Sequence, residues 1–316
     1  MEYPQYDYAV IGGDMRQVYL AEELAHHQNR VCCYALMAAP DERRCSDASV
    51  VNAVSDLREA CTGSRCVIGP IPLSKNGRDI SQNAPEGCLH LDALLSSLNP
   101  GCHFFSGCIP ESFKNAALEK GVSVHDLMEH SSLAYYNTIA TAEGALCEAI
   151  SRSPHNLRQS SCAVLGYGKC GRTLVQYLKA LCCRVFVFSI DEQECAQAAV
   201  AADTAMPLDA LLKHIGNFDF IFNTVPALIV TAEVLENVKS SATIIDIASA
   251  PGGVDFAEAQ RLGITAALCL GLPGKYAPSS SAKAVKETIE SLLSQENTCY
   301  IHGLEAAHSN EYVSNS

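Results

Sequence analysis

The segment spanning residues 161–190 constrains the fold of this chain more than any other. It reads as an apolar strand, the turn Gly166-Tyr167-Gly168-Lys169-Cys170-Gly171, a helical run and a second apolar strand. In a GxGxxG turn the first glycine permits a tight turn, the second lets the backbone approach a pyrophosphate, and the third lets the helix pack on the strand. The helix N-terminus then presents N–H groups to the phosphates. Because strands flank the pattern on both sides, it predicts a dinucleotide-binding turn.

The strand–helix alternation continues toward the C-terminus. Short apolar runs predict further strands at residues 220–223, 243–247 and 266–269. Strands separated by helical stretches are typical of a parallel, doubly wound sheet, which binds ligands beyond the carboxyl ends of its strands. We therefore expect the cofactor to contact the glycine-rich turn and the residues that follow the neighbouring strands, which are Ser189, Thr224, Val225, Pro226, Ala248 and Ser249.

The first half of the chain shows a weaker form of the same pattern. An apolar run at residues 6–11 leads into Gly12-Gly13-Asp14 and a helical stretch, but the third glycine is missing. This turn is therefore a poor candidate for binding phosphate. Further strands are predicted at residues 30–36, 66–72 and 102–107, and helical pieces at 114–120 and 124–130.

A chain of 316 residues exceeds the usual size of a single hydrophobic core, so we expect two domains. The first is an α/β substrate-side domain at residues 1–150. A polar linker after residue 150 leads into the dinucleotide-binding domain at residues 151–280. A helix at residues 281–294 is expected to return to the first domain, and residues 295–316 to form a loosely ordered tail.

The charge balance excludes some partners. The net charge of −13, from 35 acidic and 22 basic residues, argues against nucleic acid or an anionic membrane as the main partner. An anionic substrate would need a local basic pocket. The longest apolar stretches have the length of strands, so no transmembrane helix is expected.

Sixteen cysteines raise the question of disulfides or metal binding. Adjacent pairs such as Cys32-Cys33 lie in apolar runs, and the N-terminal residues lack the features of a secretory signal. We therefore expect free, mostly buried thiols in a reducing cytosol. No Cys-x-x-Cys occurs, and Cys61 and Cys66 have no partners at a zinc-ligand spacing, so no metal site is predicted.

The choice between NAD and NADP is read at the end of the second strand of the dinucleotide domain. An acidic residue there bonds the ribose hydroxyls of NAD, whereas a nearby arginine favours the 2′-phosphate of NADP. Ser189 leaves room for a phosphate, but no arginine follows, and Asp191 lies two positions on. Lys169 and Arg172 either contact phosphates or are solvated, so both cofactors stay open at this point.

Several motifs follow one another in a fixed order along the chain. They are Val10-Ile11-Gly12-Gly13-Asp14-Met15-Arg16-Gln17, Phe105-Ser106-Gly107, Tyr136-Asn137-Thr138-Ile139-Ala140-Thr141-Ala142-Glu143-Gly144, Asp246-Ile247-Ala248-Ser249-Ala250-Pro251-Gly252-Gly253-Val254-Asp255-Phe256 and Gly271-Leu272-Pro273-Gly274. Together they resemble one family, the A subunit of dipicolinate synthase, the enzyme that makes pyridine-2,6-dicarboxylate. The resemblance extends to about residue 294.

The resemblance implies a fold, a reaction and a setting. The fold is two Rossmann-like domains arranged as in formate/glycerate dehydrogenases. The reaction is NADP-dependent oxidation of a dihydrodipicolinate-type intermediate, in the mother-cell cytoplasm of a sporulating bacterium. The implied partner is the flavoprotein-like B subunit of the same synthase, and a homo-oligomer is compatible with this. Two residues depart from the family pattern: Ile190 replaces a basic residue, which keeps NAD open, and Ala140 replaces a proline.

A cyclic imine dicarboxylate needs groups that hold its two carboxylates and one that takes a proton. Arg16 is our candidate for one carboxylate, because a guanidinium binds it bidentately; the alternative is a surface arginine. Ser106 and Thr141 are candidate hydrogen-bond donors. Glu143 is a candidate base if burial raises its pKa, and otherwise a structural acid.

Two other functions remain candidates. A 2-hydroxyacid dehydrogenase usually needs an arginine after the fifth strand and a histidine after the next, but residues 248–253 and 271–278 contain neither. A noncatalytic nucleotide-binding protein, whose partner performs the chemistry, is favoured by the lack of an evident histidine or lysine base.

Overall fold

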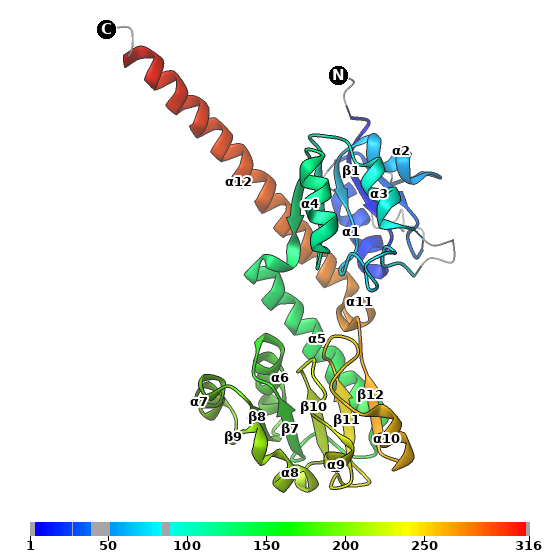
Figure 1. The fold of residues 1–316 in the computed structure, drawn as a ribbon, viewed down its shortest axis with the longest axis vertical. Helices are drawn as coiled ribbons and strands as arrows, with labels where there is room; N and C mark the ends of the chain where they lie inside the picture. The colour runs from blue at the N-terminus through cyan, green and yellow to red at the C-terminus, as the bar shows by residue number, and fades with distance from the viewer. Residues whose placement is uncertain (1–3, 27, 39–50, 84–88, 314–316) are drawn as a thin grey trace. The chain divides into compact units, whose positions relative to one another are not determined.

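The structure is a computed structural model that describes residues 4–26, 28–38, 51–83 and 89–313, with side chains described as far as Glu296. The chain forms two compact units (Figure 1). Unit 1 comprises Met1–Ala134 and Pro278–Ser316, and unit 2 comprises Tyr135–Ala277. Among the described helices, none is long and apolar enough to cross a membrane.

Unit 1 contains a six-stranded sheet of order β3-β2-β1-β4-β5-β6 in which every pair is parallel. The direction of the strand order reverses between β1 and β4, and such a switch point opens a crevice at the carboxyl ends of the strands. The strands are β1 (Tyr6–Ile11), β2 (Val31–Tyr34), β3 (Val51–Ala53), β4 (Ser64–Ile68), β5 (His103–Ser106) and β6 (Ser123–Asp126).

Helices cover both faces of this sheet, because the strands are apolar on both sides. One core contains Leu57, Leu94 and Phe113 from α2, α3 and α4. The other contains Leu20 of α1 and Ile289 of α12, packed on β1, β4 and β5. The helices are α1 (Met15–Ala25), α2 (Leu57–Thr62), α3 (Leu91–Ser97), α4 (Glu111–Glu119) and α12 (Pro278–Val313), with the 3₁₀ turn η2 (Leu127–Glu129).

Unit 2 repeats the topology, with a parallel six-stranded sheet of order β12-β11-β10-β7-β8-β9. Its switch point lies between β7 and β10. The strands are β7 (Ser161–Leu165), β8 (Arg184–Ser189), β9 (Thr204–Pro207), β10 (Phe220–Asn223), β11 (Thr243–Asp246) and β12 (Thr265–Leu268). The helices are α5 (Ser131–Arg152), α6 (Lys169–Ala180), α7 (Glu192–Ala201), α8 (Leu211–His214), α9 (Ala232–Leu235), α10 (Phe256–Arg261) and α11 (Leu272–Tyr276), with the 3₁₀ turns η3 (Leu208–Ala210) and η4 (Ile215–Asn217).

The predicted fold class, two doubly wound parallel α/β domains, is confirmed. The predicted helix at residues 124–130 is wrong: residues 123–126 form β6, which pairs with β5. A run this short does not distinguish a strand from a helix by its period. The sequence does not predict β3 and β9, since each is short and half-buried or exposed.

The two compact units divide the chain at Tyr135 and Pro278. Unit 2 begins at Tyr135, so it includes α5 except its first four residues, and also the polar stretch expected to be a linker. Whether residues 1–150 and 151–280 fold as separate domains stays a prediction. Helix α12 contains residues 281–294 but continues to Val313, so the backbone of the expected tail is helical as far as that residue. The tail contains no proline and several good helix formers.

Candidate functional site

The glycine-rich turn after β7 has the geometry that its sequence predicts. Gly166 has φ +88° and donates its N–H to the Phe188 carbonyl at 2.8 Å. A Cβ at Gly166 would lie 2.6 Å from Thr224 Oγ1, and a Cβ at Gly171 would overlap the Gly166 carbonyl oxygen. Both positions therefore require glycine, and together they bring α6 against the end of β7.

Gly168 plays a different part, because it faces open space. It is the N-cap of α6, with an ordinary φ of −67° and no side-chain hydrogen bond to the helix end. The nearest atom to a Cβ built there is Glu194 Oε1, at 4.0 Å. The first-turn N–H groups of α6 are therefore accessible to an anion such as a pyrophosphate.

The corresponding turn of unit 1 is closed. Asp14 and Gln17 form a capping box that occupies the N-terminal N–H groups of α1. In front of it, the Gly13 N–H donates to the Ser81 carbonyl at 2.9 Å, and the Asn83 N–H donates to the Gly13 carbonyl at 3.0 Å. A phosphate would have to displace these bonds, so the turn of unit 2 is the better dinucleotide site.

An acidic side chain that the sequence reasoning missed lies at the end of β8. Glu194 Oε2 accepts the Ser189 hydroxyl at 2.6 Å and the Tyr167 N–H at 3.1 Å. Asp191, in contrast, caps α7 by accepting the N–H groups of Gln193 and Glu194. The carboxylate at the end of β8 therefore comes from helix α7, five residues beyond the last residue of the strand. The sequence offered one signal for this position. Asp191 is a favourable N-cap residue, and a helix beginning there places Glu194 in its first turn, beside the end of β8.

Lys169 and Arg172, the two basic residues near the start of α6, have neighbours within unit 2. The Arg172 Nε donates to the Tyr167 carbonyl at 2.9 Å, and its Nη2 donates to Gln197 on α7. The guanidinium thus links the start of α6 to α7 by hydrogen bonds. The Lys169 ammonium is 5.3 Å from the ring centroid of Tyr135, and Lys169 is exposed.

Buried polar residues hold the loops after β10 and β11. The Asp246 carboxylate is fully buried and accepts from Asn223 Nδ2 at 2.9 Å, the Ala248 N–H at 3.0 Å and the Gly253 N–H at 2.7 Å. The Thr224 hydroxyl donates to the Leu165 carbonyl at 2.9 Å. The expected cofactor-contacting residues after these strands thus sit on fixed backbone. Thr224, Val225, Pro226 and Ser249 are at least partly exposed, and Ala248 is buried.

Arg16 and Ser106 lie in unit 1, where both hold the loop that follows β4. The Arg16 guanidinium is buried and pairs with both Asp14 carboxylate oxygens, while its Nη2 also donates to the Ile71 carbonyl at 2.5 Å. The Ser106 hydroxyl is fully buried and donates to the Pro70 carbonyl at 2.6 Å. Of the Arg16 nitrogens, Nη1 has no hydrogen-bond partner among the residues that the structure describes.

Thr141 and Glu143 lie on α5, in unit 2. The Thr141 hydroxyl donates to the Asn137 carbonyl at 2.8 Å, within its own helix. Glu143 is exposed and accepts the Tyr177 hydroxyl at 2.9 Å. The burial that a base role for Glu143 requires is therefore not present in this structure.

A second acid of α5 anchors the motif at residues 271–276. The buried Glu148 accepts Lys275 Nζ at 2.5 Å and the Tyr276 hydroxyl at 2.7 Å, and it pairs with Arg152. Burial opposes ionisation of Glu148, but these donors hold the pKa of its carboxyl below the usual value. The motif thus attaches α11 to α5 through the contacts of Lys275 and Tyr276 with Glu148.

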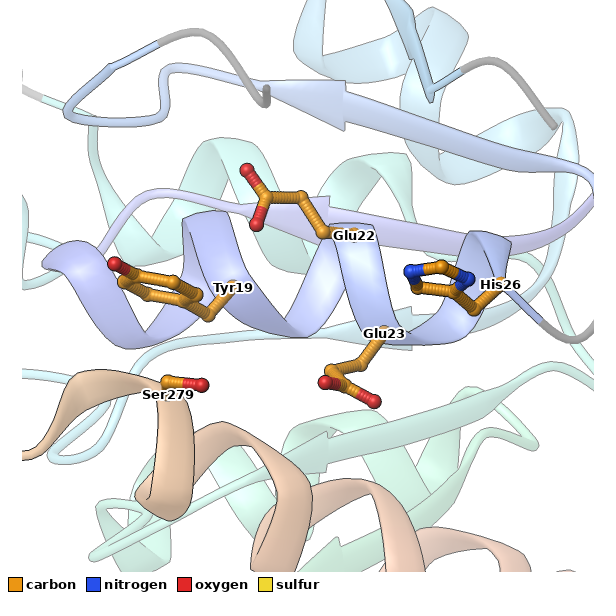
Figure 2. Close-up of a pocket in the computed structure, with 5 residues that line it drawn as sticks. All are labelled: Tyr19, Glu22, Glu23, His26 and Ser279. Carbon is orange, nitrogen blue, oxygen red and sulfur yellow. The ribbon is translucent and has the colours of Figure 1, made fainter. Parts of the chain in front are cut away.

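A cavity of about 500 Å³ lies in unit 1, between α1 and the start of α12 (Figure 2). It is lined by Tyr19, Glu22, Glu23, His26 and Ser279. Two glutamates line it, with no lysine or arginine among the lining residues. Because these carboxylates would repel a dicarboxylate, this cavity is a poor substrate site.

Comparisons with known proteins agree with this geometry. Residues 7–128 match the N-terminal domain of the dipicolinate synthase A subunit, and residues 127–254 match the NAD-binding domain of D-isomer specific 2-hydroxyacid dehydrogenases. The chain is 28% identical to the dipicolinate synthase A subunit of Bacillus subtilis (strain 168), over 91% of this chain and 95% of that protein.

Crystal structures of two such proteins share the fold. The dipicolinate synthase structure from Bacillus subtilis has a TM-score of 0.76 at 27% identity, covering 94% of this chain and 98% of that one. The structure from Bacillus halodurans has a TM-score of 0.77 at 24% identity, covering 92% and 98%. Unit 2 is therefore a nicotinamide-cofactor domain of the oxidoreductase type, and the chain is similar to dipicolinate synthase A subunits over most of its length.

Proposed function

We propose that this chain oxidises a dihydrodipicolinate-type intermediate to pyridine-2,6-dicarboxylate, with NADP as the hydride acceptor and NAD as the alternative. The ring loses one hydride to the nicotinamide and one proton to a base, and becomes an aromatic pyridine. The protein's task is to orient the ring against the nicotinamide and to hold two carboxylates. The similarity of the chain to dipicolinate synthase A subunits supports the substrate class.

One observation carries the proposal. The turn at Gly166–Gly171 is open at Gly168 and lies at the switch point of unit 2, whereas the matching turn of unit 1 is closed by its own cap and backbone bonds. A dinucleotide would place its pyrophosphate at the N-terminus of α6. The residues proposed to contact it are Gly166, Tyr167, Gly168, Lys169, Cys170, Gly171, Ser189, Thr224, Val225, Pro226, Ala248 and Ser249.

The remaining site residues are proposed from the chemistry of the substrate. Ser106 and Thr141 would each have to exchange a backbone carbonyl for a substrate carboxylate in order to donate to it. Glu143 would act as a base only in a state in which substrate or protein covers it. Arg16 has Nη1 left to bind one carboxylate.

Arg16→Ala is expected to raise the KM for the intermediate about tenfold or more, because a charge-assisted hydrogen bond contributes roughly 1.5–3 kcal/mol. Steady-state kinetics and a thermal melt of the same sample measure this. Arg30→Ala is the matched control. The Arg30 guanidinium also donates two hydrogen bonds to an aspartate of unit 1, Asp7, but its side chain is exposed. An unchanged KM in folded Arg16→Ala would remove Arg16 from the substrate site.

The proposal extends to partners and setting. We propose a complex with the flavoprotein-like B subunit of the synthase, a homo-oligomer of this chain within that complex, and a location in the cytoplasm of a sporulating mother cell. The support is the similarity of this chain to A subunits of that synthase. Co-purification of the tagged chain with its flavoprotein-like partner, followed by light scattering, tests the complex.

The decisive assay gives the purified chain the intermediate together with NADP or NAD, and follows the absorbance of the reduced nicotinamide. Turnover by the chain alone supports the proposal. Binding of cofactor without turnover, with activity only when the flavoprotein-like partner is added and unaffected by Arg16→Ala, would assign the chain the noncatalytic nucleotide-binding role. Turnover of D-lactate in place of the intermediate would identify a 2-hydroxyacid dehydrogenase.

A further inference from the structure

Two histidines of unit 1 lie together on one face of the sheet. His103 is on β5 and His125 is on the neighbouring edge strand β6, where the register pairs Phe105 with His125. The His125 ring stacks on Phe105, with ring centroids 4.5 Å apart. Both imidazoles are largely buried, with side chains 16% and 13% exposed. Packing therefore fixes the direction in which their nitrogens point.

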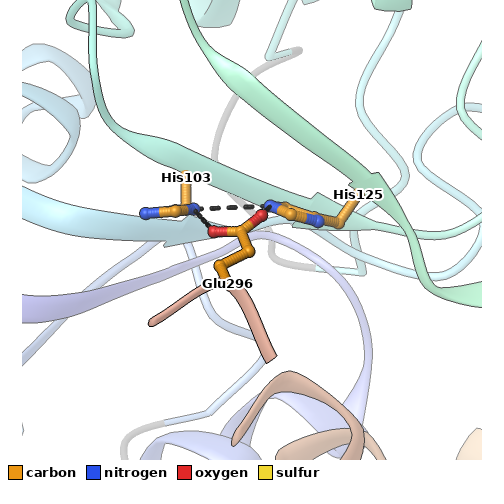
Figure 3. A group of neighbouring side chains, drawn as sticks. All are labelled: His103, His125 and Glu296. Atoms are coloured by element: carbon orange, nitrogen blue, oxygen red, sulfur yellow. Dashed lines mark hydrogen bonds and ion pairs between the residues drawn. The ribbon is translucent and has the colours of Figure 1, made fainter. Parts of the chain in front are cut away.

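Glu296 of helix α12 reaches both rings (Figure 3). Its Oε2 is 3.4 Å from His103 Nδ1, and its Oε1 is 3.5 Å from His125 Nε2. The two ring nitrogens are themselves 3.4 Å apart. One possible ligand atom from each of the three residues thus lies within 4.8 Å of the other two, on two neighbouring strands and the C-terminal helix.

These separations are long for hydrogen bonds, which usually measure about 2.7–3.2 Å between heavy atoms. The separation of the two ring nitrogens matches neighbouring ligands of a tetrahedral zinc ion, which lie about 3.4 Å apart when the zinc–ligand bonds measure about 2.0–2.2 Å. The histidines contact different oxygens of Glu296, so a rotation of the carboxylate would bring one oxygen to the ion. Burial lowers the pKa of both imidazoles, against the opposing charge of Glu296. The neutral ring is the form that binds a metal.

We propose that His103, His125 and Glu296 form a binding site for a divalent transition-metal ion, best matched by Zn²⁺. Two imidazoles and one carboxylate are an established ligand set for zinc and leave a fourth position for water. Glu296 is 46% exposed, so solvent reaches that position. All three ligands belong to unit 1, whereas the open turn belongs to unit 2, and the site does not depend on the proposed reaction.

The ion would extend the attachment of α12 to unit 1. Ala282, Val285 and Ile289 already bury one side of this helix in the core with β1 and α1. Glu296 lies about two helical turns beyond Ile289. A zinc ion held from β5 and β6 would therefore fix α12 at Glu296 against the edge of the sheet.

A titration with Co²⁺ and with Zn²⁺ tests this site. The metal is first removed from the chain with a chelator, and the chelator is then removed by dialysis. We expect one Co²⁺ per chain, with visible d–d absorption and no thiolate charge-transfer band. Zn²⁺ should displace it and raise the Tm by about 5 °C at a hundredfold excess over Kd. The spectrum matters because Cys108, Cys147 and Cys182 are exposed and could bind zinc through sulfur.

His125→Ala and Glu296→Gln should each weaken Co²⁺ binding by at least about tenfold. Glu296→Gln changes an exposed side chain, so it keeps the test valid if His125→Ala folds poorly. His90→Ala is the matched control, since His90 also pairs with one acid, Asp79, in unit 1. Unchanged Co²⁺ binding in Glu296→Gln, a thiolate band, or no binding would each overturn the proposal.

Discussion

Gly168→Ser should weaken dinucleotide binding by about tenfold or more while making the chain slightly more stable. Gly168 is the N-cap of α6, and no side chain caps that helix now. Serine is a better N-cap than glycine, by a few tenths of a kcal/mol, because its hydroxyl accepts an N–H of the first turn. The same hydroxyl would occupy the donors and the space that a pyrophosphate requires.

Opposite changes in stability and binding make this prediction specific. Isothermal titration with NAD and NADP gives the affinities, and urea denaturation gives the free energy of unfolding. Gly171→Ala is the companion variant, because its Cβ would overlap the Gly166 carbonyl oxygen and push α6 from β7. It should lose both stability and binding. Wild-type affinity in Gly168→Ser would show that the dinucleotide does not approach the turn at this residue.

The turns and central strands could be predicted from the sequence because they depend on neighbouring residues. Glycines 166, 168 and 171 are spaced for a turn that the flanking apolar runs place between a strand and a helix, and the structure has that turn. The central strands β1, β4, β7 and β10 are largely buried on both faces, so they appear as nearly continuous apolar runs. At these positions, glycine spacing and runs of apolar residues are sufficient to predict the turn and the strands.

Features that depend on distant residues could not be predicted in this way. A helix at residues 124–130 would put His125 on a helix, but pairing with β5 makes residues 123–126 a strand and sets His125 beside Phe105. The sequence marks Arg16 as a basic side chain, but its bond to Ile71 depends on a loop 55 residues away. The expectation that no metal site exists rests on cysteine spacing, which says nothing about histidines on adjacent strands.

Glu194→Gln should raise the affinity for NADP relative to NAD by about tenfold or more. The carboxylate lies at the end of β8, bonded to the Ser189 hydroxyl and the Tyr167 N–H. This is the end of the second strand of unit 2, where an acid bonds ribose hydroxyls and a phosphate replaces one of them in NADP. Two unit charges 4 Å apart repel by about 1 kcal/mol in water and about 4 kcal/mol near a protein surface.

The change in the NADP-to-NAD affinity ratio isolates this effect from any general loss of binding. Glutamine keeps an oxygen that can accept the Tyr167 N–H, so the turn is preserved while the charge is removed. Glu236→Gln is the charge-matched control, because it follows α9 in the same unit, is exposed, and lies toward the amino ends of the strands. Ile190, the residue after β8, is 83% exposed and offers a 2′-phosphate no charge. Cofactor preference in this chain would then depend on Glu194, and an unchanged ratio in Glu194→Gln would show that the ribose binds elsewhere.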